Sequence, residues 1–392
     1  MLTLSGRQLQ AVEQLKRFKV GALFMEPGTG KTFTACQLLK EIKTLKIWFT
    51  TCANKNNLQS ELELCGEYNY LIYGIESISQ SDRIYNEIVD LVLSKVCCIV
   101  CDESIKIKNI EAKRTKRLLE ISKHCEYKLI LNGTPFTKSI LDLWTQMEFL
   151  SPKILNMGYS EFKNKFCEYI KINKYKNGII SAKEFIVGYH NLDYLHSLVK
   201  HYIYECKLEL IVEKNQYNIN YKIEDELIEE YNNIKKKFLN EEYLFSRDGN
   251  IFLELTQKMQ HSYCCAEEKF NCVKRIIEEH KSVLIFCKYV KSQEELSKRF
   301  PEAVVLTYGR HSFGLNLQDY NVIIYFDKTF DYGQKLQSSY RIYRLGQKEN
   351  CLYYELTGDV GLESVIDKNI TKKISMTEYF KVKTLTELQA EL

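Results

Sequence analysis

The sequence of 392 residues contains only four prolines and 17 glycines, and its 55 basic and 51 acidic side chains nearly balance. Low-complexity and disordered chains are rich in proline and glycine or carry a large net charge, so this composition excludes both classes. The surplus of +4 does not identify a partner, because a basic groove can be hidden in a nearly neutral total. The sequence also lacks an apolar run of about 18 residues and an N-terminal apolar stretch of signal-peptide length, so it predicts neither a membrane segment nor export.

Hydrophobic residues make up 45% of the chain, which is long enough for two or three domains with their own cores. Many of the 14 cysteines lie in apolar runs, so we expect reduced thiols of a cytoplasmic protein rather than a disulfide scaffold. Cys98 and Cys101 form a CxxC in a predicted strand, where the two side chains point to opposite faces and cannot both reach one metal ion. His261, Cys264 and Cys265 lack a second pair at zinc-finger spacing, which indicates packing residues.

Apolar segments of strand length alternate with helical patterns in two stretches of the chain. They are GALFM, KIWFTTC, YLIYG, VCCIVCD and KLILNG in the first stretch, and SVLIFC, AVVLTY, NVIIYFD and YYELTG in the second. This alternation predicts an α/β fold with two lobes, each a parallel sheet covered by helices.

The pattern changes between the two stretches. From Ser151 to about Lys200 the sequence is aromatic, Lys-rich and helical in pattern, which predicts a helical insertion with little strand character. Two strand-like runs follow, LELIV and YNINYKI, and then a long charged helical stretch. We expect, in order, an N-terminal lobe, an insertion with return strands and a linker, a helical protrusion of the second lobe, and a C-terminal lobe with a terminal helical brace, over 1–150, 151–222, 223–280 and 281–392.

A glycine-rich turn follows the first predicted strand and opens a helix, in the sequence GALFMEPGTGKTFTACQLLK. This strand, turn and helix are the context that a phosphate-binding loop requires. Gly28, Thr29 and Gly30 would bring backbone N–H groups close to phosphate oxygens. Lys31 would supply a point charge for the β- and γ-phosphates, and the Thr32 hydroxyl would bind Mg²⁺. The segment therefore predicts a site for a nucleoside triphosphate.

A pair of carboxylates ends the apolar strand of KVCCIVCDESIKIKN. Acidic pairs at strand ends are common, but together with a phosphate loop they indicate hydrolysis. Asp102 would hold Mg²⁺, and Glu103 would orient or deprotonate the attacking water.

The string DESIKIKN, followed by LILNGTPFTKSILDLWTQMEFLSP, resembles the Swi/Snf-like ATPases of helicase superfamily 2. In GRQLQAVEQL, Gln8 stands where that family has a glutamine that contacts adenine. Asn57 and Glu61 in TTCANKNNLQSEL correspond to motif Ia. Motif III corresponds to Gly133, Thr134 and Pro135, and SVLIFCKY, SFGLNLQ and QKLQSSYRIYRLGQ resemble motifs IV, V and VI. Seven ordered motifs thus cover nearly the whole chain.

The resemblance implies two RecA-like lobes with helical insertions between them, and a DNA-dependent ATPase that uses ATP and Mg²⁺. Arg341 and Arg344 of motif VI lie three residues apart and would share one face if they were helical. Arginine forks onto phosphate oxygens, so the pair can stabilise the transferring γ-phosphoryl group when the lobes close. Gln337, Gly346 and Gln347 around them match the motif and argue against an ordinary solvated basic face.

Closure coupled to hydrolysis would move the protein along nucleic acid, and the resemblance implies double-stranded DNA contacted through its phosphates without sequence preference. The residues carried over by motif position as nucleic-acid contacts are Lys55, Asn57, Thr134, Lys288 and Asn316. Two alternatives stay open: a helicase that unwinds forks or migrates branches on forked or single-stranded DNA, and an ATP-gated DNA clamp with little hydrolysis.

The sequence departs from the family at three places. Ser104 and Ile105 follow Glu103 where the family ends motif II with histidine. Tyr340 and Tyr343 replace the usual aspartate and histidine of motif VI. Only 24 residues separate Cys287 from Ser312, which predicts a missing βα unit and a smaller second sheet. The chain is compact and rich in Lys, Ile, Asn and Tyr, and in this it resembles phage-encoded members of the family. We therefore expect a prokaryotic host cell.

Overall fold

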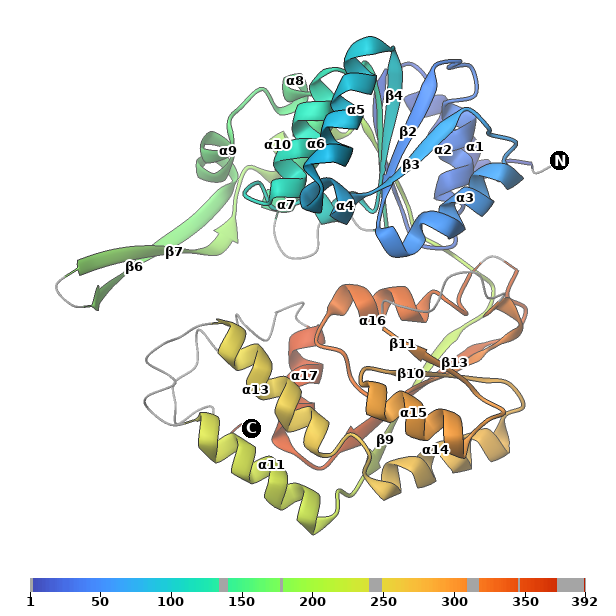
Figure 1. The fold of residues 1–392 in the computed structure, drawn as a ribbon, viewed down its shortest axis with the longest axis vertical. Helices are drawn as coiled ribbons and strands as arrows, with labels where there is room; N and C mark the ends of the chain where they lie inside the picture. Colours follow the sequence, from blue (N-terminus) through green and yellow to red (C-terminus); the bar gives the residue numbers. More distant parts are fainter. Residues whose placement is uncertain are drawn as a thin grey trace. The chain divides into compact units, whose positions relative to one another are not determined.

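The computed structural model describes residues 3–133, 140–176, 179–239, 249–308, 317–344, 346–371 and 391. The chain divides into two compact units, Met1–Leu208 and Glu209–Leu392. Each unit contains a sheet in which every strand pair is parallel, with helices packed on it (Figure 1). The predicted α/β fold with two parallel-sheet lobes is therefore confirmed. None of the helices in the described ranges has the length and apolar character needed to span a bilayer.

Unit 1 contains a six-stranded sheet in the order β3-β2-β4-β5-β1-β8. Its strands are β1 (Val20–Met25), β2 (Leu45–Thr50), β3 (Tyr70–Gly74), β4 (Cys97–Asp102), β5 (Tyr127–Asn132) and β8 (Ile203–Cys206). All six residues of β4 are buried, as expected for a central strand with both faces covered. Because the strands are parallel, their carboxyl ends meet at one edge of the sheet, and the loops that follow β1, β2 and β4 gather there.

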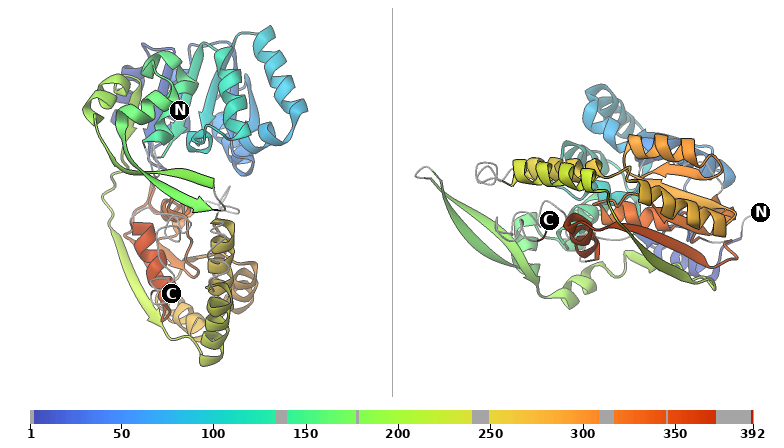
Figure 2. Two further views of the ribbon diagram at one scale, coloured as in Figure 1. Left: turned by 90° about the vertical axis from the view of Figure 1, so that its left-hand side faces the viewer. Right: turned by 90° about the horizontal axis from the view of Figure 1, so that it is seen from below.

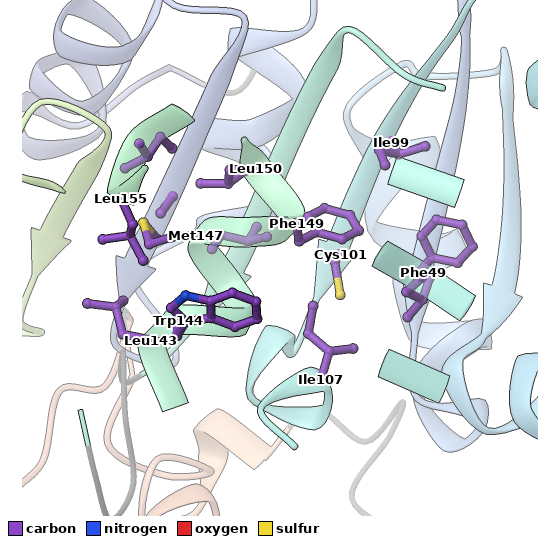
Figure 3. Close-up of a cluster of buried hydrophobic side chains, with 14 of the residues drawn as sticks. Phe49, Ile99, Cys101, Ile107, Leu143, Trp144, Met147, Phe149, Leu150 and Leu155 are labelled. Atoms are coloured by element: carbon purple, nitrogen blue, oxygen red, sulfur yellow. The ribbon is translucent and has the colours of Figure 1, made fainter. Parts of the chain in front are cut away.

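Helices cover the two faces of this sheet and form separate cores. They are α1 (Gly6–Leu15), α2 (Lys31–Leu38), α3 (Lys55–Leu64), α4 (Ile75–Gln80), α5 (Asp82–Ser94), α6 (Lys113–Lys123), α7 (Leu141–Leu150), α8 (Pro152–Leu155), α9 (Tyr159–Phe166) and α10 (Leu192–Val199), with short 3₁₀ turns η1 (Cys52–Asn54) and η2 (Ser104–Ile107). Trp144, Met147 and Phe149 of α7 pack in the same core as Cys101 (Figure 3). Cys98 belongs to the core on the other face, as strand alternation predicts for this CxxC.

An antiparallel hairpin interrupts the segment that was expected to be helical. Its strands are β6 (Cys167–Lys176) and β7 (Ile179–Tyr189), paired with one register shift near Glu168. The prediction of little strand character was therefore wrong here, although α7 to α10 around the hairpin are helical. Isoleucine alternates with polar residues at 170–173, and Asn-Gly stands at 177–178 in the sequence. Both are strand and hairpin signals, which the lysine and tyrosine content obscured.

The return strand also lies earlier than expected. LELIV at 208–212 is not a strand; β8 precedes it and pairs with β1, from Ala22–Ile203 to Met25–Cys206. The second run, YNINYKI, overlaps β9 (Lys214–Tyr221), which pairs with β13 of unit 2. The apolar residues of LELIV therefore lie in the connection between the units, where Ile211 is fully exposed.

Unit 2 contains a five-stranded sheet in the order β11-β10-β12-β13-β9. The other strands are β10 (Val283–Cys287), β11 (Val304–Thr307), β12 (Val322–Tyr325) and β13 (Cys351–Gly358). The helical elements are α11 (Asp225–Phe238), α13 (Gly249–Ser262), α14 (Glu267–Glu279), α15 (Val290–Arg299), η3 (Leu317–Asp319), α16 (Tyr332–Ser339) and α17 (Gly361–Thr371). The sheet is one strand smaller than that of unit 1, and one core joins α14 and α17 to it. The expected terminal brace lies mostly outside the described residues.

Candidate functional site

The phosphate loop joins β1 to α2 and has the backbone geometry that its glycines predict. Gly28 and Gly30 adopt φ values of 85° and 80°, a left-handed region that other residues rarely enter. The Thr29 hydroxyl donates to the Glu26 carbonyl at 2.7 Å and closes the turn. The loop is therefore held by its own backbone.

The helix that follows begins at Lys31, with no side chain capping its N-terminus. The first N–H groups of such a helix lack internal partners and attract anions. Lys31 and Thr32 are half-buried, and across the described ranges neither side chain has a hydrogen-bond or ionic partner. The turn thus presents an unpaired ammonium and an unpaired hydroxyl beside uncapped amides, as phosphate and Mg²⁺ would require.

Gln8, expected at adenine, packs against this loop in the structure. Its Nε2 donates to the Thr29 carbonyl at 2.9 Å, and its Oε1 accepts from the backbone of Ser5 at 2.8 Å. A Cβ placed on Gly30 would collide with the Gln8 amide, so only glycine fits there. Gln8 therefore buttresses the loop, and its contact with adenine stays a prediction.

The two carboxylates stand at the carboxyl end of β4, next to the end of β2. Asp102 is buried, and its Oδ2 accepts from the Thr50 hydroxyl at 3.0 Å and from Asn54 Nδ2 at 3.1 Å. Glu103 adopts φ 56°, an uncommon conformation for a residue with a side chain. Strain of this kind, about 1 kcal/mol or more, gathers at functional sites.

Burial, followed by the charge of the neighbouring Glu103, raises the pKa of Asp102 to about 7, although Lys31 and the Thr50 hydroxyl oppose the shift. A desolvated carboxylate beside a second carboxylate is stabilised by a cation. The donor set of Asp102, Glu103 and Thr32 therefore fits the hard, oxygen-preferring ion Mg²⁺.

Thr50 and Asn54 were not identified from the sequence, although they hold Asp102. They belong to the end of β2 and the turn after it, and β2 is the parallel neighbour of β4. A polar pair directly after a buried strand, in the letters FTTCAN, was the available signal.

The position that departs from the family in motif II makes a contact of its own. The Ser104 hydroxyl donates to Gln146 Oε1 on α7 at 2.7 Å, and both residues are buried. Lys108 forms an ion pair at 3.7 Å with Asp142, which lies on α7 as Gln146 does. Motif II is thereby tied to α7, the helix that follows motif III in sequence.

The predicted nucleic-acid contacts of unit 1 lie near the start of α3. Lys55 is its first residue and has no partner among the side chains that the structure describes. Asn57 donates to Glu61 Oε1 one turn later at 3.1 Å, so both motif Ia residues are paired on the helix surface. Of motif III, Gly133 packs against Pro27 of the phosphate loop, while Thr134 and Pro135 lie outside the described residues.

Lys288, the contact predicted in unit 2, turns into its own unit. Its Nζ donates to Gln260 Oε1 at 3.1 Å and lies 3.1 Å from the centre of the Phe330 ring. Burial lowers the pKa of Lys288 to about 7, partly opposed by the charges of Asp327 and Glu363. Asn316, the fifth predicted contact, lies outside the described residues.

The arginines of motif VI lie in a turn rather than on a helix, because α16 ends at Ser339. Both Arg341 and Arg344 are half-buried, so the shared helix face considered from their spacing does not form.

Tyr340 and Tyr343, which stand where the family has aspartate and histidine, pack this turn against other parts of unit 2. Tyr340 and Tyr343 are buried, and Lys214 Nζ of β9 lies 4.4 Å and 3.9 Å from the centres of their rings. Tyr343 Oη also accepts from the backbone of Leu210 at 3.4 Å. The sequence did not identify Lys214, because the two tyrosine rings that it contacts lie more than a hundred residues away in the chain.

The chain matches the SNF2-related domain over residues 45–283, more than half of its length. It is 22% identical to the transcription regulatory protein SNF2 of Saccharomyces cerevisiae over 95% of this chain and 26% of that protein. It is 30% identical to the human DNA repair and recombination protein RAD54B over 30% of this chain and 12% of that protein. The chain thus spans 26% and 12% of these relatives' own lengths.

A solved structure, the Sulfolobus solfataricus SWI2/SNF2 ATPase core in complex with double-stranded DNA, aligns over 100% of this chain and 97% of that one, with 19% identity and a TM-score of 0.44. The family expected from DESIKIKN and the motifs around it is confirmed by the domain match. The chain belongs to the SNF2-related family.

Proposed function

We propose that this chain is a DNA-dependent ATPase that moves along double-stranded DNA without reading its sequence. The observation that carries the proposal is the carboxyl edge of unit 1. There an unpaired Lys31 at a left-handed glycine loop stands near a desolvated Asp102 followed by Glu103. The family membership and the human DNA repair relative support DNA as the substrate.

In this proposal the backbone of Gly28, Thr29 and Gly30 cradles the phosphates, and Lys31 binds the β- and γ-phosphates. Gln8 keeps the loop in shape and contacts adenine with its remaining N–H.

Mg²⁺, when bound with ATP, would neutralise charge on the phosphates. Thr32 and Asp102 would hold it, and Glu103 would orient or deprotonate the attacking water. Thr50 and Asn54 keep Asp102 facing the site by donating to one of its oxygens, which leaves the other for the metal.

Arg341 and Arg344 are proposed to contact the γ-phosphate from unit 2, as guanidinium groups do in phosphoryl transfer. Lys55, Asn57, Thr134, Lys288 and Asn316 remain proposed DNA contacts. Of these, Lys55 has the support of an unpaired side chain, whereas Lys288 would have to leave the aromatic ring of Phe330.

The test is ATP turnover of the full chain with no nucleic acid, single-stranded DNA, duplex DNA and RNA at one stated salt concentration, because phosphate contacts are salt-dependent. We expect stimulation by duplex DNA that is lost in Lys31→Ala. Turnover that is indifferent to DNA would overturn the proposal.

Two assays separate the proposal from its alternatives. A translocase displaces the third strand of a triplex and leaves the duplex paired, whereas a fork-unwinding helicase separates the duplex. An ATP-gated clamp would show ATP-dependent DNA affinity with no release of phosphate.

A further inference from the structure

The hairpin of β6 and β7 projects from unit 1, and its base packs in the core of that unit through Cys167 and Ile186. Ten register pairs run from Cys167–Tyr189 to Lys176–Ile179. Figures 1 and 2 show the two strands extending past α9, away from the helices that pack on the sheet. A two-stranded hairpin is marginally stable by itself, so the strands beyond this base add little to the folding of unit 1.

The base of the hairpin is firmly attached. Asn191 Nδ2 donates to the Lys165 carbonyl at 3.0 Å, and the backbone of His190 donates to the Phe166 carbonyl at 3.1 Å. The Phe166 ring stacks on Tyr194, and Lys165 Nζ lies 4.7 Å from the centre of the same tyrosine ring. The two strands are thus mounted on a fixed base made by α9 and α10.

The hairpin and its base hold the whole formal charge surplus of the chain. Residues 163–189 contain six lysines and two glutamates, and the net charge of the chain is +4. The other 365 residues carry as many acidic as basic side chains. A balanced protein with one basic projection directs its long-range attraction for a polyanion to that projection.

In the strand register, three of the four lysines of β6 and β7 have a neutral residue directly opposite. Lys171 is the one opposite an acid, Glu184, while Lys174, Lys176 and Lys183 lie opposite Ser181, Ile179 and Ile172.

The remaining glutamate is engaged at the base. Glu168 lies against Gly188 and 3.9 Å from His190 Nδ1. Between 170 and 186 the sequence of the two strands holds four lysines and one glutamate.

We infer that the β6–β7 hairpin is a second nucleic-acid contact, which lies along the phosphate backbone of the duplex that the motor engages. The inference rests on the proposed function and adds to it a contact that none of the seven motifs contains. Ten residues of strand span about 33 Å, which matches about one turn of B-DNA. Lysines that neutralise phosphates bind every sequence alike and release counterions.

The test compares two full-length variants that each lose four lysine charges from unit 1. The hairpin variant is K171Q/K174Q/K176Q/K183Q. The control variant is K16Q/K40Q/K43Q/K95Q, whose lysines are exposed and lie where strands of the sheet begin, at the edge opposite the phosphate loop. Fluorescence anisotropy with a labelled duplex of about 40 base pairs measures Kd between about 50 and 200 mM salt.

We expect the hairpin variant to bind duplex DNA at least about tenfold more weakly, and the slope of log K against log salt to fall by about 2 to 3, since each phosphate contact contributes about 0.9. The control variant should keep the wild-type slope. ATP turnover without DNA and the melting temperature should be unchanged in both, because neither set belongs to the nucleotide site or the core.

Equal slopes for the two variants, with normal DNA binding by the wild type, would overturn the inference and leave the proposed function intact. Wild-type protein that neither binds nor responds to DNA would overturn the proposed function itself. Loss of binding to an acidic protein partner with unchanged DNA slopes would also count against the inference and assign the hairpin to protein recognition.

Discussion

The carboxyl edges of the two parallel sheets both carry charged side chains, but these differ in whether they form ion pairs. In unit 1, the side chains of Lys31 and Glu103 make no hydrogen bond or salt bridge in the described part of the chain, and Asp102 is held by neutral donors. In unit 2, the charges that follow β12 are paired and buried. Lys269 Nζ lies 2.7 Å from Asp327 Oδ1, with both side chains almost completely inaccessible to solvent.

Further pairs in unit 2 join residues of α16, α17 and β13 to their surroundings. The ion pairs Lys328–Asp367 and Lys335–Glu355 measure 2.5 Å and 2.9 Å, and Tyr263 donates to Glu363 at 2.6 Å. Buried charges need partners because desolvation without one costs several kcal/mol. A folded protein leaves such groups unpaired where a ligand completes them. This contrast supports unit 1 as the place of the proposed nucleotide chemistry, and we propose that the network of unit 2 fixes the shape of its edge.

Breaking the buried pair of unit 2 should give the largest effect on folding. Lys269→Met removes the ammonium partner of the buried Asp327 and leaves it the Lys288 backbone N–H at 3.0 Å, so we expect the free energy of unfolding to fall by about 3 kcal/mol. The matched control is Lys274→Met on the same helix, where Lys274 makes only an exposed pair with Glu278. Urea unfolding of the full chain measures both, and the control should stay within about 0.5 kcal/mol of wild type. Equal stability of the two variants would mean that the buried pair is not what holds this edge.

The same lysine-to-methionine change in unit 1 should lower ATP turnover and leave the stability of the fold unchanged. Lys31→Met removes a charge with no internal partner, so the melting temperature should hold while ATP turnover falls by about 10²–10³. Lys40→Met, an exposed position just past the end of the same helix, is the control and should keep full turnover. If Lys31→Met destabilised the fold as Lys269→Met does, the contrast between the two edges would be lost.

Much of unit 1 could be predicted because its signals are local. The phosphate loop joins a strand, a turn and a helix within twenty residues, and the carboxylates directly end a buried strand. Asp327 and Lys269 are 58 positions apart, and Thr50 is 52 positions from Asp102. Contacts of that range depend on which strands are neighbours, which no local pattern specifies.

The missed hairpin has a different cause. Its letters alternate with a period of two, but the expectation was set by the helical patterns on either side of it, from α7 to α10. In β6 this alternation covers only residues 170–173, which is short beside those helical patterns. The signal that remained was the Asn-Gly pair at 177–178.

A smaller effect is expected where a neutral donor positions the unit 1 carboxylate. Thr50→Val removes the hydroxyl that donates to Asp102 at 3.0 Å, a bond that contributes about 1.4 kcal/mol, or about tenfold in turnover. Thr50→Ser keeps the donor and should restore the rate, which separates positioning from simple packing. Single-turnover ATP hydrolysis measures this, and an unimpaired valine variant would show that Asn54 alone suffices to hold Asp102.

The smallest effect concerns the unit 2 lysine whose charge is only partly compensated. Because burial lowers the pKa of Lys288 to about 7 from 10.5, the unfolded chain binds the proton more strongly between these two values. The free energy of unfolding should therefore rise with pH above about 7, because Lys288 of the folded protein is then neutral and no ammonium group is buried. We expect the wild type to gain about 1 kcal/mol over Lys288→Met between about pH 7 and 9. Urea unfolding at each pH gives this difference, with the exposed Lys291→Met as a control that should show no such rise. Parallel stability curves for wild type and Lys288→Met would mean that Lys288 keeps its charge, and that Asp327 and Glu363 compensate it as fully as they do the other lysines of this network.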